Sequence, residues 1–279
     1  MAIYYLAVKS LRRGDGRNAV AAAAYRSGER LSDEREQKQF DYRRRKGVLA
    51  TGISGWEGSR ENLWNAAEEA ERRKNSVVAR EVILALPHEL QQDGLQRLVE
   101  KYSEWLHARH GFAVDWAIHK PDRDGDQRNL HAHLLLTTRR VVDDTLTGKT
   151  RELDRRQTSS GHLEEWRRNW ARYCNVAMMA EQVESILDHR SYERQAKASG
   201  KKVKVAQKHL GVVQTHMLRK GIKTSRAEFN ETVKQQIDAE RAFPFSKTFA
   251  AQGGELGGRM ECENTRNQRK RSARQGYSR

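Results

Sequence analysis

The sequence has little of what secreted, membrane-spanning or disulfide-stabilised proteins require. Its 279 residues include only two cysteines, Cys174 and Cys262, which are too few for a disulfide framework and too far apart for a structural zinc site. The N-terminus has no apolar run typical of an export signal, and no stretch of about 18 apolar residues occurs. We therefore expect a cytoplasmic protein with no membrane insertion, in which both cysteines are reduced and have no functional role.

Acidic residues are scarce relative to basic ones. The chain has 53 Lys and Arg against 37 Asp and Glu, which gives a formal net charge of +16. Such an excess favours a polyanionic partner, with nucleic acid as the first candidate and an anionic membrane surface as the second. Although only 37% of the residues are hydrophobic, a chain of this length can still bury a core, so a globular enzyme fits the composition.

The hydrophobic pattern predicts an α+β protein. Aromatic and β-branched residues indicate strands, and apolar residues at helical spacing indicate helices. Residues 43–58 combine a basic run with a glycine-rich stretch and predict an exposed connection, and the composition of 253–279 is typical of a disordered tail. The predicted strands are 2–9, 76–86, 112–119 and 131–138, and the predicted helices are 17–30, 62–73, 91–110, 163–187 and, weakly, 227–241.

Three histidines fall at the ends of two neighbouring predicted strands. His131 and His133 share one face of their strand, because successive side chains alternate, while Ala132 points into the core. If the two strands pair antiparallel through the polar loop between them, His119 lies roughly opposite His131. Three neutral imidazoles on a rigid sheet could hold a divalent metal and leave coordination positions open for phosphate oxygens.

This region allows two other interpretations. The histidines could be ordinary residues on a half-exposed strand, which is the commoner explanation for an isolated His-x-His pair. The loop also contains Asp122, Asp124 and Asp126, which mimic the start of a calcium-binding loop. However, its glycine is misplaced and the last ligand position falls on His133 instead of a glutamate. We therefore assign the three aspartates to a solvated turn.

Glu81 stands out as a charged residue inside an otherwise apolar predicted strand. Burying a carboxylate is costly unless it is paired or faces a site. Glu81 could therefore orient a metal-binding histidine, or it could face solvent or pair with Arg80. Tyr25 lies on the alanine-rich predicted helix at 17–30, where a tyrosine is most often a packing residue, so spacing by itself does not select it as a nucleophile.

A series of ordered motifs resembles the MobA/MobL relaxases of the MOBQ branch, which also contains the amino-terminal domain of a Ti-plasmid transfer protein. The similarity covers roughly residues 1–226 and is loosest over 41–47. The matching stretches are Met1 to Ile3, Ala23-Ala-Tyr25-Arg26, Asp41 to Gly47, Glu81 to Pro87, Trp116-x-x-His119, Asn129-x-His131-x-His133-Leu134, Leu187 to Tyr192, His209 to Gly211, and Arg219-x-Gly221-Ile222.

The resemblance implies an antiparallel sheet flanked by helices, a relaxase-type palm with the His-x-His pair on a central strand. It implies metal-dependent nicking and rejoining of single-stranded DNA at a plasmid transfer origin through a 5′-phosphotyrosine. By this comparison Tyr25 is the nucleophile and Glu81 is a catalytic acidic residue. The metal, Mg or Mn, is held by His119, His131 and His133. Apart from the resemblance, charge makes Arg26, Arg43, Arg44, Arg45 and Lys46 the candidate DNA contacts, although such a basic run is more often simply solvated.

The resemblance also implies an organisation and partners. We expect a relaxase domain at 1–226, a helical extension at 227–252 and a basic tail at 253–279, acting with accessory mobilisation proteins and a type IV secretion coupling protein. The chain lacks the phosphate-binding loop of relatives with a fused helicase, and a proline usual near the His-Leu-Gly segment is absent. Rolling-circle initiators or transposases of similar chemistry, and a non-catalytic nucleic-acid-binding protein, are the alternatives.

Overall fold

The computed structural model describes residues 4–121, 126–200, 203–208 and 210–242. The chain divides into two compact units, Met1–Ser191 and Tyr192–Arg279. The predicted tail and residues 243–252 of the predicted helical extension lie outside the described residues, as do Asp122, Asp124 and Cys262. Among the helices of the described residues, none combines the length and the apolar character that a bilayer crossing demands.

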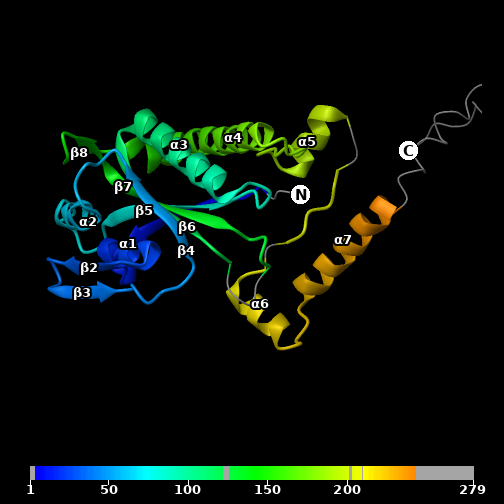
Figure 1. Ribbon diagram of the computed structural model, residues 1–279, viewed down its shortest axis with the longest axis horizontal. Coiled ribbons are helices and arrows are strands. Elements are labelled where there is room, and N and C mark those ends of the chain that lie inside the picture. Colours follow the sequence, from blue (N-terminus) through cyan, green and yellow to red (C-terminus); the bar gives the residue numbers. More distant parts are fainter. Residues whose placement is uncertain (1–3, 122–125, 201–202, 209, 243–279) are drawn as a thin grey trace, which may run out of the picture. The chain divides into compact units, whose positions relative to one another are not determined.

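The first unit is built on an antiparallel sheet whose central strand carries the His-x-His pair (Figure 1). Every described neighbour pair in the sheet is antiparallel, and β8 adds to the far end of β7. A separate hairpin is formed by β2 and β3. The sheet order is β1 (Leu6–Arg12), β5 (Val77–Ala85), β7 (His131–Val142), β6 (Phe112–His119) and β4 (Val48–Ser54); the others are β8 (Thr145–Lys149), β2 (Arg30–Asp33) and β3 (Lys38–Asp41).

Helices cover both faces of this sheet, so the predicted α+β class with an antiparallel sheet flanked by helices is confirmed (Figure 1). One face packs against α3 (Gln92–His110) and α4 (Arg156–Ala180), and the other packs against α1 (Ala19–Ser27) and α2 (Arg60–Glu69). Two short 3-10 turns, Arg13–Asp15 and Arg151–Leu153, precede α1 and α4. The described helices of the second unit are α5 (Tyr192–Ser199), α6 (Val212–Arg219) and α7 (Ser225–Ala242).

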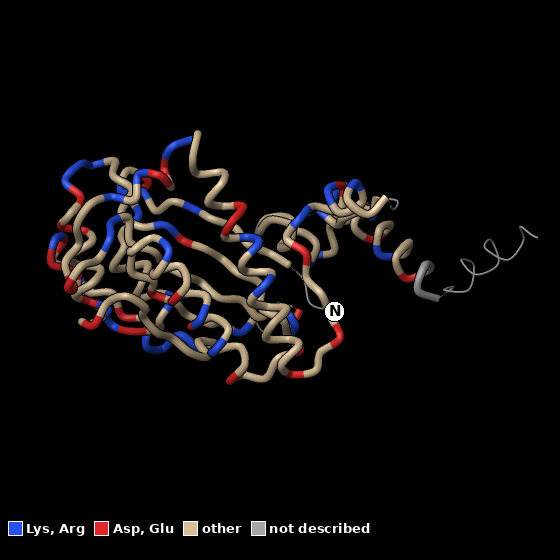
Figure 2. Tube along the Cα trace, turned by 90° about the horizontal axis from the view of Figure 1, so that it is seen from above, with Lys and Arg blue, Asp and Glu red and all other residues tan. Residues whose placement is uncertain are grey.

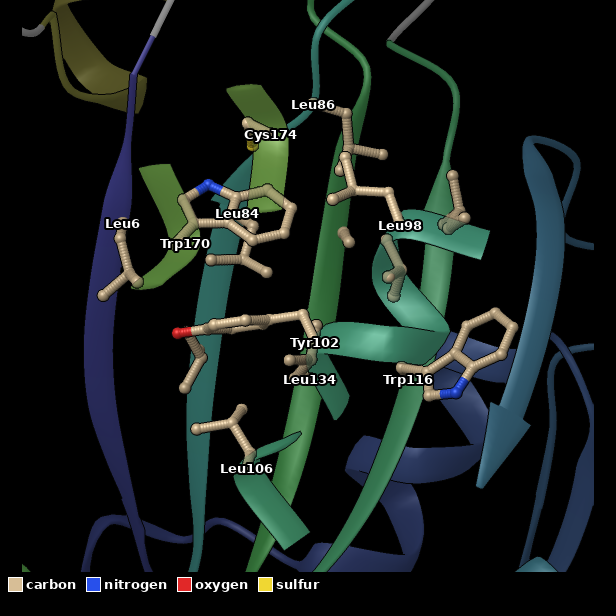
Figure 3. Close-up of a cluster of buried hydrophobic side chains, with 14 of the residues drawn as sticks. Leu6, Leu84, Leu86, Leu98, Tyr102, Leu106, Trp116, Leu134, Trp170 and Cys174 are labelled. Carbon is tan, nitrogen blue, oxygen red and sulfur yellow. The ribbon is translucent and has the colours of Figure 1, made fainter. Parts of the chain in front are cut away.

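The larger core lies between the sheet and the pair α3 and α4 (Figure 3). Leu84, Trp116 and Leu134 project from three adjacent strands toward Tyr102 and Trp170 of the helices. Along β7, the core residues Ala132, Leu134 and Leu136 are fully buried, which confirms the predicted alternation. The histidines, at the intervening positions, must therefore face the other side of the sheet.

The second core, on the histidine side, is built from small residues. Helix α1 begins after Asn18, whose side chain accepts a hydrogen bond from the Ala21 N–H, and it ends at Gly28 with φ 70°. Its buried alanines, including Ala23 and Ala24, let the helix lie close to the sheet. This close approach brings the C-terminal end of α1 to the histidines.

The prediction of an exposed connection over the glycine-rich stretch 47–58 was wrong, because residues 48–54 form β4 and pair with β6. Gly52 lies opposite Trp116, and a Cβ at this position would approach the indole ring to within 2.3 Å. The glycine therefore makes room for a large core side chain. The short strands β2, β3 and β8 were also absent from the prediction.

Most predicted helices exist, with shifted ends. The helix predicted at 163–187 begins at Arg156 and ends at Ala180, after which Gln182 adopts a positive φ of 57°. The segment after it returns to α4 through Asn175, whose amide group bonds both the N–H and the carbonyl of Leu187. Cys174 is a free cysteine buried inside the larger core.

His110, at the end of α3, makes the stability of the larger core sensitive to acid. Its Nε2 accepts a hydrogen bond from Trp166 Nε1 at 2.8 Å, and its ring stacks on Phe112. Burial, followed by the nearby charges of His162 and Arg109, lowers the pKa of His110 to about 4. Because the unfolded state binds a proton near pH 6.5, the stability contributed by neutral His110 is complete above that pH and is lost as pH falls toward 4.

We expect the free energy of unfolding to fall by up to about 3 kcal/mol between pH 6.5 and 4 through this residue. A His110→Gln variant, which can still accept from Trp166 but does not titrate, should show a shallower loss. Urea unfolding at pH 7, 5.5 and 4.5 measures the difference. Equal pH dependence in both proteins would contradict this prediction.

Candidate functional site

The three histidines meet at one end of the sheet. His119 and His131 are direct cross-strand partners, as predicted, and His133 lies two residues further along the same face of β7. The ring centroids are 5.6 Å apart for His119 and His131, 4.9 Å for His119 and His133, and 5.2 Å for His131 and His133. One nitrogen from each ring lies within 4.8 Å of the others, a spacing that one metal ion can bridge.

Each ring is held by a hydrogen bond to an oxygen atom. His119 Nε2 lies 2.7 Å from the Arg26 carbonyl, and His131 Nδ1 lies 3.1 Å from the Asn129 carbonyl. His133 Nδ1 lies 2.7 Å from Glu81 Oε1. Because these oxygens only accept, the bonded nitrogens carry the protons, and the opposite nitrogen of each ring has the lone pair that binds a metal. This is the usual hydrogen-bonding pattern of metal-binding histidines.

His119 gives the clearest indication that the centre is built for a ligand. Its side chain is 2% exposed, and within the described residues its Nδ1 is buried without a hydrogen-bond partner. Burial, and then the charges of His133, Arg45 and His131, lower the pKa of His119 to about 4, although the bond to Arg26 opposes this. The ring is therefore neutral at physiological pH, as a metal ligand must be. The three side chains fit a divalent metal ion.

Glu81 lies beneath His133 and does not face solvent. Its Oε1 accepts hydrogen bonds from His133 Nδ1 at 2.7 Å, Arg26 Nε at 2.9 Å and Arg26 Nη2 at 2.7 Å. Burial alone would raise the pKa of Glu81, but the bond from His133 and the charge and bonds of Arg26 lower it to about 2. The alternative that Glu81 forms an ion pair with Arg80 is wrong, because Arg80 points to the opposite face of the sheet and binds Asp154. The carboxylate is placed to orient a ligand histidine.

Arg26 connects helix α1 to the centre twice. Its carbonyl holds His119 and its guanidinium holds Glu81, and the side chain is only 15% exposed. The sequence prediction placed Arg26 among the DNA contacts, and its double attachment was missed. The alanines that precede it in the motif carried no signal of these contacts, which depend on strands 55 to 93 residues away.

Tyr25 precedes Arg26 and is exposed, with 47% of its surface accessible. Its ring meets Tyr42 edge-on at 5.3 Å, and Arg45 lies over the ring face at 3.7 Å from its centroid. Arg45 also donates to the Tyr25 carbonyl. The ring is thus oriented by its neighbours while the side chain remains open to a large substrate, and its backbone is fixed to the histidine centre through the next residue.

The remaining basic residues of the predicted DNA-binding run have different environments. Arg43 is exposed and pairs with Asp41 at 2.7 Å, and its hydrogen bonds lower the pKa of Asp41 to about 2. Arg44 and Lys46 are exposed, whereas Arg45 packs on Tyr25. Of this basic run, Arg45 alone is shown in contact with Tyr25, and the other three residues follow or precede it in the same exposed segment.

Comparison with known proteins places this arrangement in a family. The model of the MobA/MobL family matches residues 17–220. The mobilization protein MobL of Acidithiobacillus ferridurans is 33% identical over 70% of this chain and 59% of its own length. The conjugal transfer protein TraA of Agrobacterium fabrum is 28% identical over 70% of this chain and 20% of its own length.

A solved structure from work on vancomycin resistance transfer in Staphylococcus aureus is also similar. It is 28% identical, has a TM-score of 0.60, and covers 68% of this chain and 100% of that chain. The chain thus spans about 59% of the mobilization protein and 20% of the conjugal transfer protein that it matches. Because the family model covers most of the chain, including Tyr25, Glu81 and all three histidines, the chain belongs to the MobA/MobL family.

Proposed function

We propose that this protein is a DNA relaxase, an enzyme that nicks one strand at a plasmid transfer origin and rejoins it through a 5′-phosphotyrosine. The observation that carries the proposal is the connection between the exposed Tyr25 and the three-histidine centre, of which His119 is buried, through a single adjacent residue, Arg26. The family membership and the names of the relatives, mobilization and conjugal transfer proteins, support the same activity.

In the proposed reaction, the Tyr25 oxygen attacks the scissile phosphorus and the bond from phosphorus to the 3′ oxygen breaks. The DNA 5′ phosphate becomes joined to the tyrosine and the phenolic proton passes to solvent. The departing 3′ oxygen takes a proton from solvent, so that the released strand ends in a 3′ hydroxyl. Because one phosphate ester replaces another, the bond energy is conserved and the 3′ hydroxyl can reverse the step. Fixing α1 against the sheet holds the nucleophile in position for in-line attack.

The three histidines would hold the metal, and Glu81 would keep His133 in the tautomer that binds it. A divalent ion, Mg or Mn, would supply positive charge against the charge that develops on the scissile phosphate. Neutral histidine ligands leave this charge undiminished, and His119 is held neutral by burial. Glu81 places a carboxylate next to His133 and balances the charge of Arg26.

Single-stranded DNA at a transfer origin is the proposed substrate. Arg43, Arg44, Arg45 and Lys46 lie in the segment that packs on Tyr25 and are the proposed phosphate contacts, consistent with a net charge of +16. A relaxase domain ending near residue 226, accessory mobilisation proteins and a secretion coupling protein stay predictions.

The proposal is tested by mixing the purified protein with Mn²⁺ or Mg²⁺ and labelled oligonucleotides that cover candidate transfer origins of its replicon. A protein–DNA adduct that survives denaturing electrophoresis is expected, and chelation should abolish it. His131→Ala should slow its formation by at least about 100-fold, because one of three ligands is lost. His162→Ala, on the α4 side of the sheet, serves as the matched control and should behave as wild type.

Salt-sensitive DNA binding without an adduct on any cognate site would contradict the proposal and favour a non-catalytic binding protein. An adduct formed only at replication origins would instead favour the rolling-circle alternative. If neither chelator nor His131→Ala affected adduct formation, the histidine centre would have no part in the reaction.

A further inference from the structure

A second basic site lies at the other end of the sheet face that carries the histidines. An open groove of about 880 Å³ is bounded by the end of α2, the loop after it, and the strands β7 and β8. Basic residues occur throughout the first unit, so their number alone does not locate a binding site (Figure 2). This groove combines two cations that are fixed on a buried carboxylate with three exposed arginines.

Glu71 forms the buried floor of the groove. Its Oε1 accepts from Arg139 Nε at 3.1 Å and its Oε2 accepts from Lys149 Nζ at 2.5 Å, while its side chain is only 3% exposed. The remaining Arg139 nitrogens donate to the carbonyls of Ala70 and Thr147. Two cations thus share one carboxylate, which leaves the floor positively charged and rigid.

Three further arginines line the groove, and all are exposed: Arg72, Arg73 and Arg151. Within the described residues, none of their guanidinium groups has an ion-pair or hydrogen-bond partner. The groove therefore holds five basic side chains against two acidic ones, Glu69 and Glu71. An excess of unpaired guanidinium groups over a fixed positive floor favours a ligand with several phosphates.

We propose that this groove binds the phosphate backbone of the substrate DNA, away from the nick. The inference rests on the proposed relaxase function and names a second contact region for the same substrate. Arg139 and His133 point to the same face of β7 and are six residues apart, which is roughly 20 Å along a strand. This distance corresponds to about six nucleotides at the spacing of roughly 3.4 Å per nucleotide of one strand in B-form DNA. The groove is open and its cations come from four segments, the loop after α2, β7, β8 and the 3-10 turn Arg151–Leu153, which suits an extended polyanion.

The test compares wild type with a groove variant, Arg72→Ala, Arg73→Ala and Arg151→Ala. The matched control, Arg97→Ala, Lys101→Ala and Arg172→Ala, removes the same charge from exposed positions of α3 and α4. Each protein is titrated at several salt concentrations with two oligonucleotides. One spans only the nick site, and the other carries about 15 more nucleotides on each side with any native inverted repeat.

The groove variant should bind the long oligonucleotide on the order of 10-fold more weakly than wild type at 0.1 M salt. Its slope of log affinity against log salt should decrease by about 2, because each lost phosphate contact removes about 0.7 to 0.9. Its affinity for the short oligonucleotide and its adduct rate at saturation should match wild type. The control variant should keep the wild-type slope on both oligonucleotides.

Equal losses for the groove and control variants would overturn the proposal, because net charge alone would then explain them. Unchanged binding of the long oligonucleotide by the groove variant would also overturn it and would leave an acidic protein as the alternative occupant. Adduct formation by wild type on the short oligonucleotide reports the proposed relaxase function separately. A failure there would reject that function, whereas a failure confined to the long oligonucleotide would reject only the groove.

Discussion

A Tyr25→Phe variant is expected to lose covalent adduct formation below detection while it binds DNA within about twofold of wild type. The substitution removes one oxygen atom and keeps the ring that contacts Tyr42 and Arg45. No bond to the scissile phosphorus can form without that oxygen, whereas backbone contacts with the DNA remain. Denaturing electrophoresis measures the adduct, and fluorescence anisotropy with the same labelled oligonucleotide measures binding.

Tyr42→Phe is the matched control for this experiment, because Tyr42 touches the Tyr25 ring edge-on and lies in the same segment as Arg45. It should form adduct at close to the wild-type yield. If the Tyr25→Phe variant formed adduct normally and Tyr42→Phe did not, the nucleophile would be Tyr42 and the assignment to Tyr25 would be wrong.

A Glu81→Gln variant is expected to bind Mn²⁺ about 10 to 100-fold more weakly than wild type. The single oxygen Oε1 holds both His133 and Arg26, and an amide group cannot match a carboxylate as acceptor for a cation and a ligand histidine. The free energy of unfolding should also fall, by about 3 kcal/mol, because the buried guanidinium of Arg26 loses its counter-charge. Calorimetric titration of the metal-free protein measures the affinity, and urea unfolding measures the stability.

Adding Arg26→Met to Glu81→Gln separates the two effects. The double variant should recover part of the stability, since no unpaired charge stays buried, but it should not recover the affinity for Mn²⁺. Glu100→Gln, at an exposed position of α3, is the control for loss of a negative charge and should leave both quantities unchanged. Wild-type affinity for Mn²⁺ in the Glu81→Gln variant would show that the carboxylate does not orient the centre.

The histidine centre was predictable because it depends on short-range rules. Alternation along β7 fixes the common face of His131 and His133, and an antiparallel turn from β6 places His119 opposite His131. The choice of Tyr25 came from the resemblance to the family and from no local pattern. The local sequence of an alanine-rich helix with one tyrosine does not predict the strands on which the helix packs.

Contacts between segments that are distant in the sequence could not be predicted from it. Arg26 was predicted to contact DNA. Its bond to Glu81 on β5 was not predicted, because the two residues are 55 positions apart in the sequence. The same limitation hid β4, whose Gly52 is explained only by the indole of Trp116. It also hid the groove at the end of α2, whose floor is assembled from Glu71, Arg139 and Lys149 on three separate elements.

Peptide mapping of the purified adduct is the most direct measurement of the proposed chemistry. After digestion with trypsin and nuclease, mass spectrometry should find a nucleotide joined through its 5′ phosphate to the tyrosine of the peptide Asn18–Arg26, with the released strand ending in a 3′ hydroxyl. Attachment to another residue, or a released strand that carries a 3′ phosphate, would contradict Tyr25 as the nucleophile that takes the 5′ end.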